Sequence, residues 1–412
     1  MRVSSIALAV FLAAGALPAA AQTPAPLQAV PTQPRVLNLT GAERRALSAL
    51  QTAAAGQDRA AQDTALAAAR SAAQGADARY AAANLQFQIG RARGDANMQT
   101  QAIDALVASG VPQGAELAPL LSAQASRAYS AGDFHGADRL LTRAVELQPN
   151  NAAVVADYAQ YKARLGDRPA AVAQFQRAFE LQRAAGQPVP EAWYRRALAI
   201  AFDGRIAPQG IAFAQGLAGA YPTAVNWRDA LLAYVQLGAP DPALDLDIRR
   251  LQRAAGGLTG ERDYVEFART LNTAGASAEA KSVLDEGTER AMVLPSEAAV
   301  AALIRQVNPR AATQRSGLAA ARTRALAAAD GAAALAAGDA QYGAGNYAEA
   351  AELYAAALQK GGQDANLVNC RLGAALARAG RRPEAETALR TVTGPRAGLA
   401  GFWLTWLSRP AA

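Results

Sequence analysis

The feature that most constrains this sequence is a turn signal that recurs about every 34 residues. Gly132-Asp133 and Gly166-Asp167 are 34 positions apart, and so are Gly204 and Gly238. Comparable glycines lie further along the chain and before it, at Gly56, Gly94, Gly275, Gly345 and Gly380. A fixed period of this length is typical of proteins that stack one supersecondary unit repeatedly. The spacing predicts about nine to ten units, one of which turns near Pro309.

Each unit has the same internal pattern of small and large residues. Small residues recur seven positions before the turn glycine and five after it: Ala125, Ala159, Ala197, Ala268, Gly338 and Gly373, then Ala137, Ala171, Ala243, Ala280, Ala350 and Ala385. Large residues recur nine positions after it: Leu141, Phe175, Phe213, Leu284, Tyr354 and Leu389. Small side chains let two helices cross closely, and large ones fill the gap one turn away. The pattern therefore predicts helical hairpins that pack on themselves and on their neighbours.

Composition favours helices over strands. Of the 412 residues, 51% are hydrophobic and only 6% are aromatic, and the apolar content is mainly Ala. Ala is the strongest helix former, whereas strands need β-branched and aromatic residues. We therefore expect an all-α chain. Because a lone short hairpin cannot bury its own apolar faces, we expect the hairpins to stack.

The repeat resembles the tetratricopeptide repeat (TPR) family. The small residue early in the first helix, the Gly-Asp turn, the Ala of the second helix and Pro149 at its end match that family's pattern, most clearly over Leu121–Phe179 and Gly331–Val392. Three positions depart from it: Gln209, Leu231 and Asp247. The resemblance implies an α-solenoid wound as a right-handed superhelix, with a concave wall that binds peptides, helices or loops.

The same resemblance implies which residues line the concave wall. In this family the first helix of each hairpin lines it, at positions that here are Arg164, Tyr194, Phe202, Arg228, Arg262, Arg269 and Arg378. This set is basic and partly aromatic. Either it forms an anionic-ligand site, or its Arg side chains only solvate an Ala-rich wall. The Lys and Asn arrangement with which some family members clamp a C-terminal carboxylate is not found.

The N-terminus has the pattern of a secretory signal peptide. Arg2 supplies a positive charge, Ile6 to Leu17 an apolar run, and Ala19-Ala20-Ala21 a cleavage site before Gln22. We expect a periplasmic or secreted protein with no transmembrane segment after cleavage. The predicted divisions are a signal peptide at 1–21, a Pro- and Gln-rich linker at 22–38, the solenoid at 39–398, and an aromatic capping helix at 399–412 that carries Phe402, Trp403 and Trp406.

The residue types that catalysis and metal binding need are scarce. His135 is the only histidine, so no histidine triad or multi-histidine metal site exists within one chain. Cys370 is the only cysteine, and we expect it to be a buried small residue. Phosphate-binding loops and nucleophile elbows are missing. We therefore expect no catalytic residue, no metal and no cofactor. An enzyme is the least favoured hypothesis.

Two functions fit these features. The first is a periplasmic scaffold that binds a protein or peptide on its concave surface. The second is a cell-envelope or exopolysaccharide assembly or export factor that binds an anionic polymer, because 38 of the 41 basic residues are Arg and the formal net charge is +7. A nucleic-acid partner is not expected. GC-rich coding is an alternative explanation for the excess of Arg, because the Arg residues are dispersed along the chain and not clustered.

Overall fold

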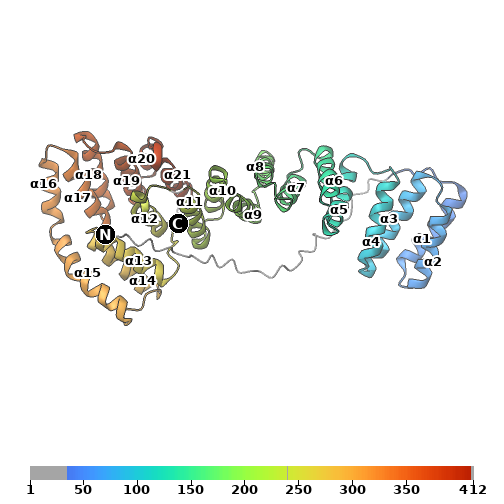
Figure 1. Ribbon diagram of the computed structural model, residues 1–412, viewed down its shortest axis with the longest axis horizontal. Helices are drawn as coiled ribbons and strands as arrows, with labels where there is room; N and C mark the ends of the chain where they lie inside the picture. Colours follow the sequence, from blue (N-terminus) through green and yellow to red (C-terminus); the bar gives the residue numbers. More distant parts are fainter. Residues whose placement is uncertain (1–34, 239, 410–412) are drawn as a thin grey trace. The chain divides into compact units, whose positions relative to one another are not determined.

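The computed structural model describes residues 35–238 and 240–409 (Figure 1). These residues form α-helices and short 3-10 turns without any strand, so the all-α prediction is confirmed. The predicted signal peptide and most of the predicted linker lie outside the described residues. The chain divides into two compact units between Gly186 and Gln187, a boundary that the sequence pattern did not mark. Among the described residues, no helix is both long and apolar enough to span a bilayer.

The described part of unit 1, residues 35–186, consists of four helical hairpins. Its elements are α1 (Gly41–Ala55), α2 (Arg59–Ala72), α3 (Ala76–Arg93), α4 (Ala96–Ala108), η1 (Gly114–Glu116), α5 (Leu117–Ser130), α6 (Phe134–Leu147), α7 (Ala152–Arg164) and α8 (Arg168–Ala184). Each odd-numbered helix packs on the next even-numbered one, and each hairpin contacts its neighbour. The apolar clusters of this unit join helices that are close in sequence. Unit 1 is therefore a stack with local contacts.

Unit 2 contains thirteen described α-helices. They are α9 (Glu191–Asp203), α10 (Ala207–Ala220), α11 (Ala224–Gly238), α12 (Asp245–Ala254), α13 (Glu261–Thr273), α14 (Ser277–Glu289), α15 (Ala298–Ser316), α16 (Leu318–Ala327), α17 (Gly331–Gly343), α18 (Tyr347–Lys360), α19 (Ala365–Arg378), α20 (Arg382–Arg390) and α21 (Ala397–Leu407), with 3-10 turns η2 (Pro242–Leu244) and η3 (Gly394–Arg396). Counted in pairs from α1, the described helices of both units give ten pairs and a final single helix, which agrees with the predicted nine to ten hairpins.

The predicted turn glycines lie between the two helices of their repeats or at the end of the first, and three of them, Gly94, Gly132 and Gly166, are followed by Asp. Gly132 and Gly166 adopt the left-handed conformation, with φ of 83° and 86°, which a glycine enters without a steric cost. The next residue then caps the second helix: the Asp133 carboxylate accepts a hydrogen bond of 2.7 Å from the Gly136 N–H. Gly204 departs from this pattern, because its φ is −85° and Arg205 takes the positive φ instead.

The predicted contact between small and large residues is confirmed. A Cβ added to Gly338 would lie 2.7 Å from the Tyr354 ring, and one added to Gly373 would overlap the Leu389 side chain. The corresponding alanines of the other repeats are fully buried, except Ala243, which is exposed because it lies in the 3-10 turn η2 and not in a second helix. Close helix crossing through small residues therefore builds the hairpins.

The prediction of a turn near Pro309 is wrong. Helix α15 continues through Pro309 to Ser316, and it is separated from α16 by Gly317. Proline removes one helical hydrogen bond, but Pro309 is exposed, so water can satisfy the freed carbonyl. The buried stripe of Val300, Leu303, Val307 and Ala311 runs on both sides of it. Helix α14 contacts α17 directly, so α15 and α16 lie on the outside of the unit 2 stack (Figure 1).

The end of unit 2 folds back on its beginning. Helix α21 packs against α19 and α20 and also against α10, and the Trp406 indole N–H donates to the Ala254 carbonyl at 3.1 Å. Phe402 is fully buried between Trp227 and Tyr234, with ring centroids 6.3 and 5.3 Å away. The aromatic helix therefore joins two ends of the unit, and it begins at Ala397, two residues before the predicted 399.

The last residues of the predicted linker contact unit 1. Arg35 forms an ion pair of 2.7 Å with Glu116, and its guanidinium lies over the Tyr80 ring. The Asn38 N–H donates to the Asp77 carboxylate at 2.7 Å. Residues 35–38 are therefore held on the surface of unit 1, and Arg35, Val36 and Asn38 stay exposed there.

Candidate functional site

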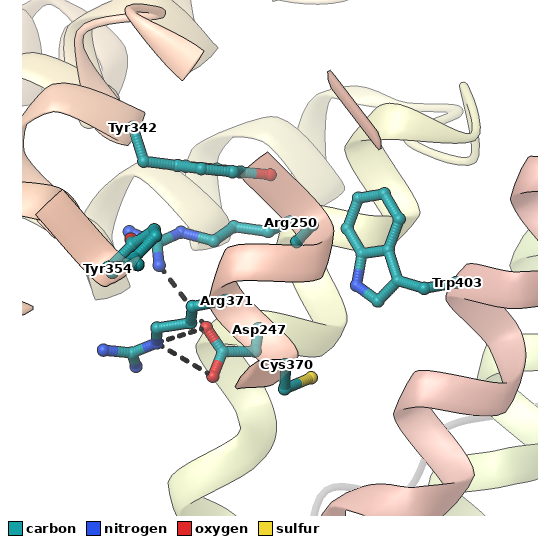
Figure 2. A pocket seen from close by; sticks show the side chains of 8 residues that line it. Asp247, Arg250, Tyr342, Tyr354, Cys370, Arg371 and Trp403 are labelled. Carbon is teal, nitrogen blue, oxygen red and sulfur yellow. Dashed lines mark hydrogen bonds and ion pairs between the residues drawn. The ribbon is translucent and has the colours of Figure 1, made fainter. Parts of the chain in front are cut away.

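Asp247, one of the departures from the repeat pattern, is the centre of a buried group of charges in unit 2 (Figure 2). It lies in the first turn of α12 and is 4% exposed. Its carboxylate forms ion pairs with Arg371 at 3.1 Å, Arg250 at 3.4 Å and Arg396 at 3.4 Å. Asp247 therefore joins α12 to α19 and to η3, which its departure from the repeat pattern did not predict.

Arg250 is held on two sides. Its Nη2 donates to Glu279 of α14 at 2.7 Å, and its Nε donates to the same carboxylate at 3.0 Å, so the pair is bidentate. Its guanidinium carbon lies 4.8 Å from the centroid of the Tyr342 ring. Burial by itself lowers the pKa of Arg250, but the Glu279 carboxylate more than offsets this and holds the pKa well above its usual value.

Asp339 of α17 completes the group. Its carboxyl accepts from Arg371 Nη1 at 2.7 Å and from the Tyr354 hydroxyl at 2.8 Å. Burial raises the pKa of Asp339 above its ordinary range, and burial likewise raises the pKa of Tyr354. We call these six residues the ionic cluster: Asp247, Arg250, Glu279, Asp339, Arg371 and Arg396. Three guanidinium groups face three carboxyl groups in it, so the charges balance.

The cavity beside the ionic cluster is too small for a substrate. Its volume is about 10 Å³, which is about the space of one water molecule. Cys370 and Trp403 complete its wall (Figure 2). Burial raises the pKa of the Cys370 thiol to about 12, so the thiol stays protonated and is a poor nucleophile. The ionic cluster therefore has a structural role: its ion pairs join α12, α14, α17, α19 and η3.

The residues predicted to line a concave wall are divided between the two units. Arg164 belongs to unit 1, and the other six belong to unit 2. Tyr194 is 5% exposed and its ring packs edge-on against Tyr221. Phe202 is half-buried, near the end of α9.

The four predicted arginines of unit 2 have separate surroundings. Arg228 is exposed and its Nε lies 4.0 Å from Asp263, while Arg262 pairs with Glu266 at 2.8 Å on the same helix, α13. Arg269, also on α13, is exposed. Arg378 donates to the Tyr347 hydroxyl at 2.9 Å and lies over that ring. The structure brings Arg228 close to α13, the helix that carries Arg262 and Arg269.

Arg164 belongs to a different group, on unit 1. Its guanidinium carbon lies 5.4 Å from the ring centroids of both Tyr129 and Tyr161. Phe134, which is 47% exposed, lies 5.1 Å from Tyr129, and Tyr161 lies 5.6 Å from Tyr129. We call Tyr129, Phe134, Tyr161 and Arg164 the aromatic surface. Arg164 makes no ion pair with any residue that the structure describes.

The Gly-Asp turns position the aromatic surface. Tyr129 lies three residues before Gly132, and Phe134 follows the capping Asp133 at the start of α6. Tyr161 and Arg164 lie five and two residues before Gly166, at the end of α7. Of these four residues, only Arg164 was predicted from the sequence. The signal that could have found the others is the clustering of aromatic residues beside two successive turn glycines.

His135 and the possible metal-ligating side chains do not form a further site among the described residues. His135 is exposed in the first turn of α6. Among the described residues, no group of three or more His, Cys, Asp or Glu side chains is placed to hold a metal ion.

The fold defines an all-α protein of stacked helical hairpins. No protein-family model matches the chain, and no curated protein matches it. One chain in a solved structure of Naa15/Naa10 bound to HypK-THB is similar over 78% of this chain, with 13% identity and a TM-score of 0.32. The similarity covers 64% of that chain. A likeness at this level carries no information about a ligand, so function has to be inferred from this chain's own residues.

Proposed function

We propose that this chain is a non-enzymatic scaffold of the TPR type that binds a peptide or protein segment on the aromatic surface of unit 1. The observation that carries the proposal is the position of Arg164, which lies over two tyrosine rings without an acidic partner among the described residues. Tyr and Arg are enriched in the few residues that supply most of the energy at protein interfaces. Here both residue types are in place before any partner binds.

The aromatic surface also suggests what the partner offers. The exposed Phe134 ring and the tyrosine faces favour an apolar side chain. Arg164, which can pair bidentately with a carboxylate, favours an acidic residue or a chain terminus. The preferred partner is therefore a segment with a carboxylate next to an apolar residue.

The surroundings of the two rarest side chains support a non-enzymatic role. A catalytic thiol needs a lowered pKa and access to substrate, whereas Cys370 is buried and its pKa is raised to about 12. His135 is exposed at a repeat turn.

Export to the periplasm or to the medium is part of the proposal. It is supported by the charged, apolar and small-residue succession of residues 1–21. Mass spectrometry of the protein recovered from the periplasm should give a mature N-terminus at Gln22. A chain that keeps its first 21 residues in the cytoplasm would contradict export, but it would leave the binding proposal intact.

Binding is tested by selecting peptides from a random phage-displayed library on the purified chain. Selected peptides should be enriched in an acidic residue beside an apolar one. Their affinity should fall at least about tenfold for Arg164→Glu and for Phe134→Ala, as expected for residues at the centre of an interface.

The matched control is Arg168→Glu. Arg168 is an exposed arginine four residues further on, at the start of α8, and it lies outside the aromatic surface. It should keep the affinity within about threefold, because exposed charges at a rim contribute little. Peptides that bind the wild type and the Arg164→Glu variant equally well would show that the aromatic surface is not the site.

A further inference from the structure

Helices α15 and α16 contain a long stretch without acidic residues. Between Glu297 and Asp330 the chain has no Asp or Glu, but it has five arginines: Arg305, Arg310, Arg315, Arg322 and Arg324. The whole chain has 34 acidic residues in 412, so a stretch of this length would ordinarily hold two or three. The result is a local excess of positive charge on two neighbouring helices.

Four of these arginines are exposed and unpaired. Arg322 forms an ion pair of 2.8 Å with Glu352. The remaining four make no ion pair with any described residue, and we call them the arginine surface: Arg305, Arg310, Arg315 and Arg324. Two exposed arginines elsewhere in unit 2 differ, since Arg381 pairs with Glu384 and Arg390 with Glu386.

The position of the two helices makes the arginine surface accessible. Because α14 contacts α17 directly, α15 and α16 stand outside the stack (Figure 1). Arg305, Arg310 and Arg315 follow each other at five-residue steps, so they are spread over about 15 Å of the helix and around its solvent side. Uncompensated like charges repel one another, and a ligand with several negative groups would relieve this repulsion.

The other exposed residues of these helices indicate which kind of polyanion fits. Helices α15 and α16 contain no aromatic residue, so they offer no platform for stacking nucleobases. Leu326 is their one large apolar side chain that is exposed, at 43%, so the anchors of a protein interface or of a membrane-inserted helix are missing. The exposed polar neighbours are Gln306, Asn308, Thr313, Ser316 and Thr323, and the other exposed residues besides the arginines are mostly Ala.

We propose that α15 and α16 bind a linear acidic polysaccharide through the arginine surface. Guanidinium groups pair with carboxylates, and the amides and hydroxyls between them can hydrogen-bond to sugar hydroxyls. This site is independent of the aromatic surface of unit 1, and either can fail without the other.

The experiment uses polygalacturonate as the probe and isothermal titration calorimetry on the full chain. The variant R305Q/R310Q/R315Q/R324Q removes the arginine surface. The control R249Q/R290Q/R381Q/R390Q also removes four positive charges from unit 2, but from arginines that each have an acidic neighbour. The first variant should lose at least about tenfold in affinity and the control less than about threefold, because only unpaired arginines are available to the ligand.

Salt dependence and a second polymer complete the test. Wild-type binding should weaken steeply as salt is added, and the dependence should become shallower in R305Q/R310Q/R315Q/R324Q. If that variant loses its far-UV dichroism, the double variants R305Q/R310Q and R315Q/R324Q should each show part of the loss. Three results would overturn the proposal: no wild-type binding, equal losses in both quadruple variants, or tighter binding of poly-L-glutamate, which would indicate an acidic polypeptide partner.

Discussion

Asp247 and Arg371, which are 124 positions apart in the sequence, form an ion pair of 3.1 Å between Oδ1 and Nε. The contacts within a hairpin are apolar and local. A small residue packs against a large one only 16 positions further on, as Gly373 packs against Leu389. Unit 2 therefore combines two types of contact. Local apolar packing builds its hairpins, and buried charge joins hairpins that are distant in sequence.

Replacing Asp247 with Asn should lower the free energy of unfolding of unit 2 by about 3 to 5 kcal/mol, because Arg371, Arg250 and Arg396 would lose a shared buried counter-charge. Urea unfolding followed by tryptophan fluorescence measures this, since all four tryptophans lie in unit 2. Asp245→Asn, on the same helix but half-exposed, should change it by less than about 1 kcal/mol. Equal effects would show that the ionic cluster adds no stability.

Gly373→Ala should destabilise unit 2 by about 1 to 3 kcal/mol, because the new methyl group overlaps Leu389. Leu389→Ala alone should cost about 2 to 5 kcal/mol through the cavity that it leaves. In the double variant the methyl group occupies part of that cavity, so the total cost should be smaller than the sum by about 0.5 kcal/mol or more. Strictly additive costs in urea unfolding would contradict the small-to-large packing.

Cys370 should be unreactive toward a thiol reagent in the folded protein. It is 1% exposed, and burial raises its thiol pKa to about 12, so the thiolate is scarce at mildly alkaline pH. Absorbance after addition of Ellman's reagent should stay flat until urea unfolds unit 2. Ser130→Cys in a Cys370→Ser background places an exposed thiol in unit 1 and should react at once. Rapid reaction of Cys370 in the native protein would contradict its enclosed position.

Glu43 should make unit 1 sensitive to acid. Backbone N–H groups of Gly75 and Thr40 donate to its carboxylate and lower its pKa from 4.5 to about 2. A depressed pKa in the folded state contributes stability above pH 4.5, and that stability is lost as the pH falls toward about 2. Thermal unfolding followed by far-UV dichroism should show this loss in the wild type and a smaller one in Glu43→Gln. The tryptophan signal, which reports unit 2, should respond equally in both.

The sequence predicted what is repeated and missed what occurs once. The hairpins follow from a period and from residues such as Ala125 and Leu141 that keep their spacing, so they could be read without coordinates. Asp247 could be recognised as an exception, but its partner Arg371 is an unremarkable helical arginine, and nothing local pairs them. The turn near Pro309 was placed wrongly because proline is tolerated in an exposed helix face. Only Arg164 of the aromatic surface was predicted. Tyr129 and Phe134 have counterparts in Tyr342 and Tyr347 at the same offsets from Gly345, whereas Tyr161 has none, because Ala375 takes its place.

The return of helix α21 to the start of unit 2 has a consequence for synthesis. Trp227 and Tyr234 leave the ribosome long before Phe402, which covers them in the finished protein. At 5 to 20 residues per second, that interval is roughly 10 to 35 s. During this interval Trp227 and Tyr234 are not yet covered by α21, while unit 1 can already fold from its local contacts. Chaperones that bind emerging polypeptides would therefore meet unit 2 open and unit 1 closed.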